Sequence, residues 1–115
     1  MFIGAVFAAV SVGLGAFGAH GLRGRLSPEM LAVFETGVRY NMYHALALLL
    51  LATLMPRMDG RALVVAGWSF VAGIILFSGS LYALALTGVT TLGAVTPLGG
   101  VAFLVGWIAL AVAAF

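Results

Sequence analysis

The segment ALVVAGWSFVAGIILFSGSLYALALT, residues 62–87, decides the fold because it contains no charged residue. A helix needs about 20 predominantly apolar residues to cross the hydrocarbon core of a bilayer. This segment is longer than that, so we expect a membrane-spanning helix over residues 62–87.

The whole chain has the same apolar character. Of its 115 residues, 7 % are charged and 64 % are hydrophobic, whereas roughly a quarter of the residues in a soluble domain are charged. Most of the surface must therefore face lipid, and residues 1–115 form one predicted membrane domain. The net charge of +2 comes from scattered arginines, which indicates membrane topology rather than a nucleic-acid partner. The absence of cysteine excludes disulfides and thiolate chemistry.

Three further helices are predicted, over residues 2–20, 28–55 and 97–115. Ser27-Pro28 and Thr96-Pro97 each combine a capping residue with a proline at the first helical position. The first helix lacks a basic start, and its apolar stretch is too long for the hydrophobic region of an ordinary signal peptide, so we expect it to be retained. Short connections between four helices predict an all-α, up-down antiparallel bundle.

The second predicted helix is longer than a bilayer requires. Pro56 ends it, and we expect its first turns, up to Glu35, to lie outside the hydrocarbon. Glu35 and Arg39 are four residues apart, with the acid first, so we expect them to form an ion pair at the membrane interface. The alternative is that Arg39 binds an anion there. Trp68 and Trp107 are interpreted as interfacial anchors.

Polar residues are expected in one half of the bundle. We call the end with both termini and the second connection side A, and the end with the first and third connections side B. Counting residues along the helices places the polar cluster in the side-B half. It comprises His20, Tyr40, Asn41, His44, Ser78, Ser80, Tyr82 and Thr96.

Two interpretations of the polar cluster remain open. In one, it lines a small vestibule in which His20 and His44 form a proton relay or part of a metal site. In the other, it is a ladder of hydrogen bonds that fixes helix register, with a neutral His44 bonded to the first or third helix or to water. Zinc requires three or four ligands, and the side-B carboxylates of Glu29 and Glu35 lie near the interface. We therefore predict no metal and no cofactor.

Small residues at helical spacing indicate close helix packing. Ser11, Gly15 and Ala19 on the first helix form such a pattern. It favours tight contacts within the chain or self-association into a homo-oligomer.

Four segments resemble the YgdD-like family of small integral membrane proteins of bacteria and animals. They are GAFGAHGL (15–22), TGVRYNMYHALAL (36–48), LFSGSLYALAL (76–86) and TPLGG (96–100) followed by Gly106-Trp107. The resemblance implies a four-helix membrane protein of unknown biochemical function and no established site residues. Asn41 stands where many relatives have Gln, which shortens the side chain but keeps the amide.

The sequence favours a non-enzymatic protein of the membrane. One hypothesis is a small channel, carrier or binding protein for a polar solute, ion or lipid, and the other is a structural or accessory protein that stabilises the membrane or an assembly partner. The expected partners are the lipid bilayer and a second copy of the chain, with no nucleic acid. We expect a bacterial inner membrane location with both termini in the cytoplasm, because Arg57 and Arg61 lie at the ends of a short connection.

Overall fold

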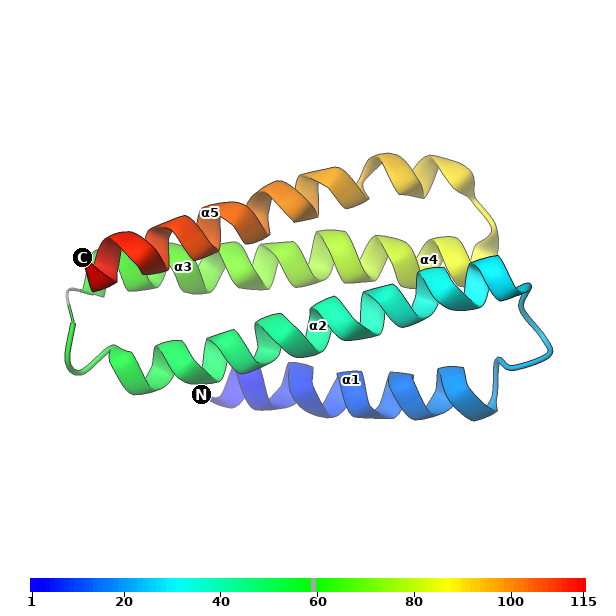
Figure 1. Ribbon diagram of the computed structural model, residues 1–115, viewed down its shortest axis with the longest axis horizontal. Coiled ribbons are helices and arrows are strands. Elements are labelled where there is room, and N and C mark those ends of the chain that lie inside the picture. The colour runs from blue at the N-terminus through cyan, green and yellow to red at the C-terminus, as the bar shows by residue number, and fades with distance from the viewer. Residues whose placement is uncertain (59) are drawn as a thin grey trace.

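The computed structural model describes residues 1–58 and 60–115 as helices joined by short connections (Figure 1). Asp59, between the two arginines of the second connection, lies outside the described residues. The elements in chain order are α1 (Phe2–His20), α2 (Pro28–Leu54), α3 (Gly60–Gly73), the π-helical turn η1 (Ile74–Ser78), α4 (Gly79–Thr87), the 3₁₀ turn η2 (Thr90–Ala94) and α5 (Thr96–Ala114).

The helix boundaries agree closely with the local sequence signals. The hydroxyl of Ser27 accepts a hydrogen bond from the Met30 N–H at 3.2 Å, so Ser27 caps α2 as predicted. Thr96 does not cap α5: its hydroxyl lies 2.6 Å from that of Ser80 instead. Proline occupies the first turn of both helices.

The predicted third helix is a continuous rod made of α3, η1 and α4 (Figure 1). Within η1 the backbone widens, and the Gly79 N–H donates to the Ile74 carbonyl, five residues earlier. Glycine and serine next to each other loosen the α-helical hydrogen-bond ladder, and Ser78-Gly79-Ser80 lies at the end of this turn. The irregularity therefore lies beside the residues that weaken the α-helical ladder.

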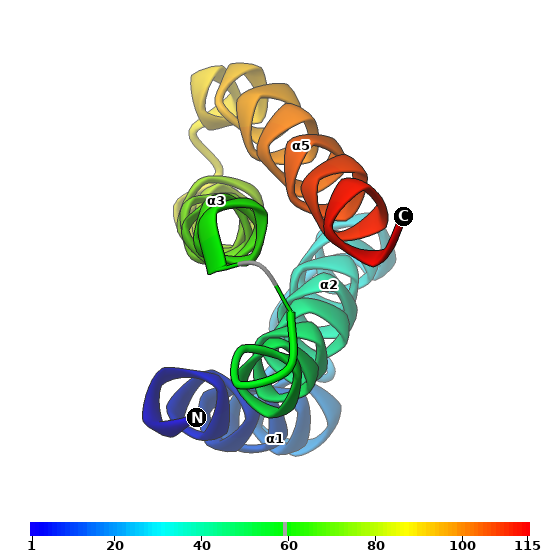
Figure 2. The ribbon, with the colours of Figure 1, turned by 90° about the vertical axis from the view of Figure 1, so that its left-hand side faces the viewer.

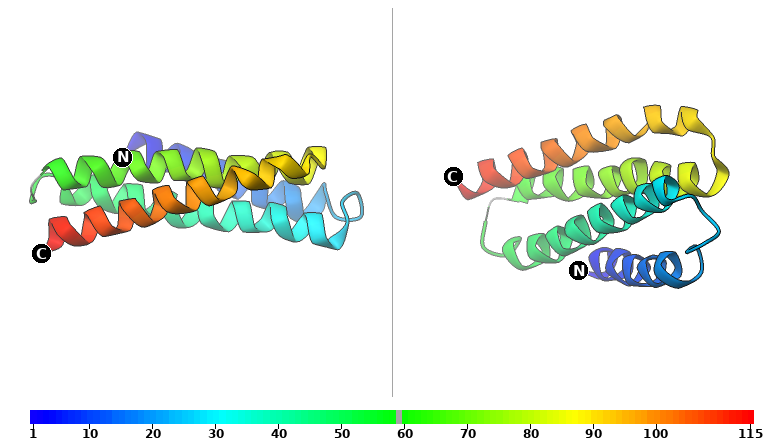
Figure 3. Two further views of the ribbon diagram at one scale, coloured as in Figure 1. Left: turned by 90° about the horizontal axis from the view of Figure 1, so that it is seen from above. Right: turned by 45° about the vertical axis from the view of Figure 1, so that its right-hand side comes forward.

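Sequence neighbours run antiparallel, and they form an open layer rather than a closed bundle. Both termini and the second connection lie toward one end in Figure 1, and the other two connections lie at the opposite end. Seen from the end, α1 lies beside α2 at one edge and α5 lies at the other (Figure 2). The two views of Figure 3 show the same slab, whose extents are 48 × 26 × 17 Å.

α5 packs against α3 and η1 through three pairs of phenylalanine and glycine. The pairs are Phe70 with Gly106, Phe103 with Gly73 and Phe77 with Gly99, and a methyl group on any of these glycines would meet its phenylalanine within 2.6 Å. The bulky residue alternates between the helices. The rings of Phe70 and Phe103 lie against the space that the opposite glycine leaves, and at Gly99 the backbone of Phe77 approaches instead. Close approach through small residues is the usual way for helices to associate in lipid.

α1 uses its small residues to pack on α2. Ser11 is buried and donates to the Val38 carbonyl at 3.2 Å, while Gly15 approaches the side chain of Val38. The face proposed from the sequence for self-association is therefore occupied within the chain, apart from the exposed Ala19. A homo-oligomer, if formed, uses another surface.

Three helical stretches are long and apolar enough to cross a membrane: Phe2–His20, Gly60–Thr87 and Thr90–Ala114. α2 does not meet this criterion over its described length, because polar residues such as Asn41 and His44 lie in its middle. Both of these side chains are buried between helices. α2 runs alongside the apolar helices and packs against them (Figure 1). Its position among the other helices therefore follows from packing and not from its own hydropathy.

Candidate functional site

His44, on α2, has both ring nitrogens engaged. Nδ1 lies 2.7 Å from the Tyr40 carbonyl oxygen, and Nε2 lies 3.0 Å from the indole Nε1 of Trp107 on α5. A carbonyl can only accept a hydrogen bond and an indole N–H can only donate one. The imidazole must therefore carry its proton on Nδ1 and accept at Nε2, which makes it the neutral Nδ1–H tautomer.

The His44 ring also packs face to face on Phe103 of α5. Their centroids are 3.5 Å apart and the rings are nearly parallel, at 8°. Only 4 % of His44 is exposed. This residue therefore joins α2 to α5, whereas the sequence predicted a partner on the first or third helix.

The structure changes the role predicted for Trp107. An interfacial anchor presents its N–H to the headgroup region, but this indole donates to His44 inside the protein. Trp107 lies seven residues before the end of α5, and Gly4, near the start of α1, lies level with Ala45. His44 therefore lies close to the middle of α2, sixteen residues from Pro28 and ten from Leu54, and not deep in the side-B half.

An aromatic groove runs between α2 and α5 beside His44. Its volume is about 520 Å³. Its wall is mostly aromatic and is formed by Tyr40, Tyr43, His44, Phe77, Gly100, Phe103, Leu104 and Trp107. The groove opens sideways, because Tyr40, Tyr43 and Trp107 are each between 39 % and 53 % exposed. In a bilayer this opening faces lipid.

Tyr40 organises the wall of this aromatic groove. Its ring lies 4.6 Å from that of Phe77 and 5.7 Å from that of Tyr43, measured between centroids. Aromatic pairs at such distances are stabilising beyond the area that they bury. No hydrogen-bond partner for the hydroxyl of Tyr40 or Tyr43 occurs within residues 1–58 and 60–115.

A second group of polar residues joins α2 to η1 and α4. Ser78 is fully buried and donates to the Gly37 carbonyl at 2.7 Å, while the Asn41 amide donates to the Tyr82 hydroxyl at 3.0 Å. The Asn41 Oδ1 is buried and has no hydrogen-bond partner among the described residues. The close approach at Gly37, where an added methyl group would lie 2.8 Å from the Tyr82 ring, allows both bonds to form.

The remaining members of the predicted cluster lie elsewhere. Ser80 and Thr96 bond to each other where α4 meets α5. His20 is exposed at the end of α1. Gly18, two residues earlier, lies against Phe34, and His44 is ten residues further along α2, or about 15 Å along its axis. The two histidines therefore do not form a relay. No group of three metal-ligating side chains occurs within the described ranges.

Glu35 and Arg39 do not form the predicted ion pair. Both are exposed, and no ion pair between them is formed in the described part of the chain. They line a shallow recess beside Gly15 and Gly18 of α1. Holding two long exposed side chains together costs entropy and gains little in a polar environment, which is a sufficient reason for them to stay apart.

The Phe–Gly pairs and the His44–Trp107 bond were not identified from the sequence. A signal for the first was present: positions 70, 73 and 77 and positions 99, 103 and 106 have the same helical spacing, with phenylalanine and glycine alternating. No comparable signal pairs His44 with Trp107, because they are 63 residues apart.

Comparison with known proteins agrees with this architecture. Residues 14–100 match a family described as "Protein of unknown function (DUF423)". The UPF0382 membrane protein YwdK of Bacillus subtilis (strain 168) is 53 % identical over 115 residues, which cover 99 % of this chain and 94 % of YwdK. A UPF0382 membrane protein of Staphylococcus aureus (strain bovine RF122 / ET3-1) is 49 % identical over 115 residues, 100 % of this chain and 93 % of that protein.

The matches extend over the whole helical layer, and no solved structure matches the chain. The sequence resemblance to the YgdD-like family is confirmed, because the family match covers most of the chain and the relatives are similar from end to end. The chain therefore belongs to the DUF423/UPF0382 family of multi-pass bacterial membrane proteins of unknown function.

Proposed function

We propose that the protein is a non-enzymatic membrane protein that binds a neutral, ring-bearing lipid in the aromatic groove between α2 and α5. The observation that carries the proposal is the groove itself, about 520 Å³ in volume and open to the surrounding lipid. Pockets of this size, with mostly apolar walls and a few polar groups, are typical small-molecule sites.

The depth of the groove favours a neutral ligand. Tyr40 and Tyr43 are twelve and fifteen residues from the start of α2, hence about 18 to 22 Å along its axis and close to its middle. A charged headgroup at that depth is costly in hydrocarbon. A flat ring with carbonyl groups, as in an isoprenoid quinone, tolerates this environment and leaves its hydrocarbon tail in the bilayer.

The chemistry of the wall favours a ring. Phe77, Phe103 and Trp107 offer apolar faces on which a flat ring stacks. The hydroxyls of Tyr40 and Tyr43, which have no partner among the described residues, supply donors for ring carbonyls. Both nitrogens of His44 are already bonded, so we assign the groove to binding and not to proton transfer.

Fluorescence of Trp107 tests the proposal, because its indole lines the groove. In a Trp68→Phe background, decylubiquinone added to the protein in nanodiscs should quench Trp107 and approach saturation. Gly100→Leu should weaken this binding about tenfold, because the new side chain enters the groove. Gly100 and the control position Gly13 both have open space around an added methyl group, with nothing within 4 Å.

Gly13→Leu introduces the same change on α1, away from the groove, and should leave the dissociation constant unchanged. Quenching that rises without saturation, or that is equal in Gly100→Leu and Gly13→Leu, would contradict the proposal.

A structural or accessory role is the second candidate, and the open layer favours it. α1 packs mainly on α2, and α5 mainly on the α3–η1 rod. Both edges of the layer therefore present helices that an assembly partner or a second copy can cover. Sedimentation in mild detergent tests whether the partner is a second copy of the chain. A dimer mass in both the wild type and Gly100→Leu supports this role.

We place side A in the cytoplasm of a bacterial inner membrane. Arg57 lies in the short connection at this end and Arg61 in the first turn of α3, and positively charged residues favour the cytoplasmic side. The chain has no cysteine, so single cysteines introduced in the connections report the orientation directly through their reaction with an impermeant maleimide.

A further inference from the structure

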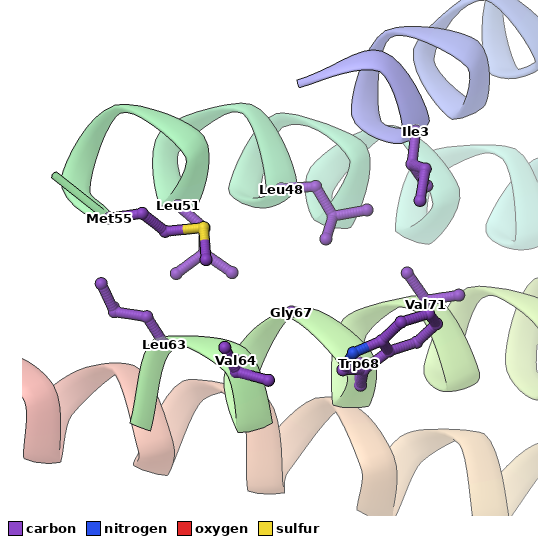
Figure 4. A pocket seen from close by; sticks show the side chains of 9 residues that line it. All are labelled: Ile3, Leu48, Leu51, Met55, Leu63, Val64, Gly67, Trp68 and Val71. Carbon is purple, nitrogen blue, oxygen red and sulfur yellow. The ribbon is translucent and has the colours of Figure 1, made fainter. Parts of the chain in front are cut away.

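A separate apolar wedge opens between the start of α1, the second half of α2 and the first half of α3 (Figure 4). Its volume is about 170 Å³. Ile3 enters from α1, Leu48 and Leu51 from α2, and Val64 and Trp68 from α3, as Figure 4 shows. The wedge has no residue in common with the aromatic groove, so a ligand in the wedge is independent of the proposed function.

The walls and size of the wedge restrict its occupant to hydrocarbon. An apolar cavity of about 150 Å³ stays dry and accepts a small apolar molecule. A further helix, about 10–12 Å across, is too wide for a recess of this volume. The material that surrounds this part of the protein is lipid, so one acyl chain is the occupant that fits.

Two arginines lie on the side-A side of the residues that line the wedge. Arg61, Val64 and Trp68 follow one another at helical spacing on α3, so they share one face. Arg61 lies about 10 Å closer to side A than Trp68, by seven residues of rise. Arg57 is exposed in the middle of the preceding connection.

These two arginines match the chemistry of a phosphate. A guanidinium forms paired hydrogen bonds with phosphate oxygens and is weakly hydrated, which favours such contacts at an interface. Arg61 already interacts with another part of the chain, and its five N–H donors still allow a phosphate contact. Trp68 is 66 % exposed at the rim of the wedge, where an indole suits the interface.

We infer that the wedge binds one acyl chain of an anionic phospholipid, whose phosphate group lies at Arg57 and Arg61. The bound lipid fills the space between α1 and α3 and links the edge helix α1 to the rest of the layer.

Quenching of Trp68 by brominated lipid tests the inference, in a Trp107→Phe background that leaves Trp68 as the only tryptophan. Nanodiscs contain phosphatidylglycerol and phosphatidylcholine in equal amounts, with bromine on the acyl chains of one or the other. We expect stronger quenching by brominated phosphatidylglycerol. Replacing Arg57 and Arg61 by Gln should lower this preference about fivefold for each arginine removed.

Gly67→Leu tests the wedge itself, because Gly67 lines it and a methyl group there would meet Leu51 only at 3.8 Å. Leucine at this position should fill the wedge and abolish the preference for phosphatidylglycerol. Gly79→Leu is the matched control on the same rod, where nothing lies within 4 Å of an added methyl group. It should leave the preference unchanged.

Equal quenching by the two lipids in the parent protein would overturn the assignment of an anionic lipid. An unchanged preference in Gly67→Leu would overturn the assignment to the wedge. Native mass spectrometry of the wild-type protein, released from the same nanodiscs, supplies a second measurement that needs no substitution. Retention of phosphatidylglycerol over phosphatidylcholine supports the site, and retention of neither overturns it.

Discussion

Gly99 is the position at which a single methyl group should most disturb the packing of α5. A Cβ at this residue would lie 2.3 Å from the backbone N of Phe77 and 2.7 Å from its Cα. These are backbone atoms, so no side-chain rotation relieves the clash. Since an ordinary contact begins at 3.4 Å, Gly99→Ala requires α5 to move away from η1 by about 1 Å.

The cost of this movement can be estimated from the contacts that it loosens. A gap of about 1 Å forfeits up to roughly half of the dispersion energy of the atoms involved. The movement also lengthens the 2.6 Å hydrogen bond between Ser80 and Thr96, which lies one helical turn from Gly99. Overpacking of this kind costs about 1–3 kcal/mol.

Gly100→Ala is the matched control, because it changes the neighbouring glycine of the same helix. Nothing lies within 4 Å of a methyl group at Gly100. Both substitutions gain up to about 1 kcal/mol of helix propensity, so the difference between the two variants isolates the steric cost.

Reversible unfolding by sodium dodecyl sulfate in mixed micelles, followed by circular dichroism, measures this difference. We expect Gly99→Ala to unfold at a lower denaturant fraction, with a free energy of unfolding about 1–3 kcal/mol below that of Gly100→Ala. Equal stability of the two variants would refute the close approach of α5 to η1.

Three other helix contacts can be tested in the same way. Gly18→Leu should lower the free energy of unfolding by about 1–3 kcal/mol, because a methyl group there would already lie 3.0 Å from the buried ring of Phe34. The control Gly13→Leu, in open space, should change the free energy of unfolding by less than about 0.5 kcal/mol. Similar losses in both variants would argue against the α1–α2 packing. A double-mutant cycle with His44→Phe and Trp107→Phe should give a coupling of about 0.6 kcal/mol, the average for interhelical hydrogen bonds in membranes, whereas additive effects would exclude the bond. Ser27→Ala should cost about 1 kcal/mol through loss of the α2 cap, and unchanged thermal unfolding would show that this cap contributes nothing.

Residues that act locally explain why the helices were predictable. Ser27 caps α2 by accepting a hydrogen bond from the N–H of Met30, three residues later, and Pro28 lies in the first turn. Pro56 follows the last residues of the helix, so α2 ends at Leu54, within one residue of the expected boundary. Each of these effects involves residues less than one or two turns apart, and the hydropathy of a span is likewise a property of one segment.

The site was predictable only in part. Of the polar residues that the sequence singled out, Asn41 with Tyr82 and Ser80 with Thr96 do bond across helices. The idea that they converge on one vestibule failed, because pairing takes place at successive levels along the helix axes. His20 does not take part, since it lies exposed at a helix end.

The sequence by itself determined that this protein consists of four antiparallel membrane helices and about where each begins and ends, because burial in lipid and helix capping depend on residues close together in the chain. Only the tertiary structure decided which faces meet. His44 reaches Trp107 because α2 and α5 both pack against the α3–η1–α4 rod, and the small-residue face of α1 is covered by α2 rather than by another copy. These outcomes depend on the relative rotation and register of helices far apart in sequence. Steric fit across the helix contact, such as that of the Phe103 ring against Gly73, selects this rotation and register.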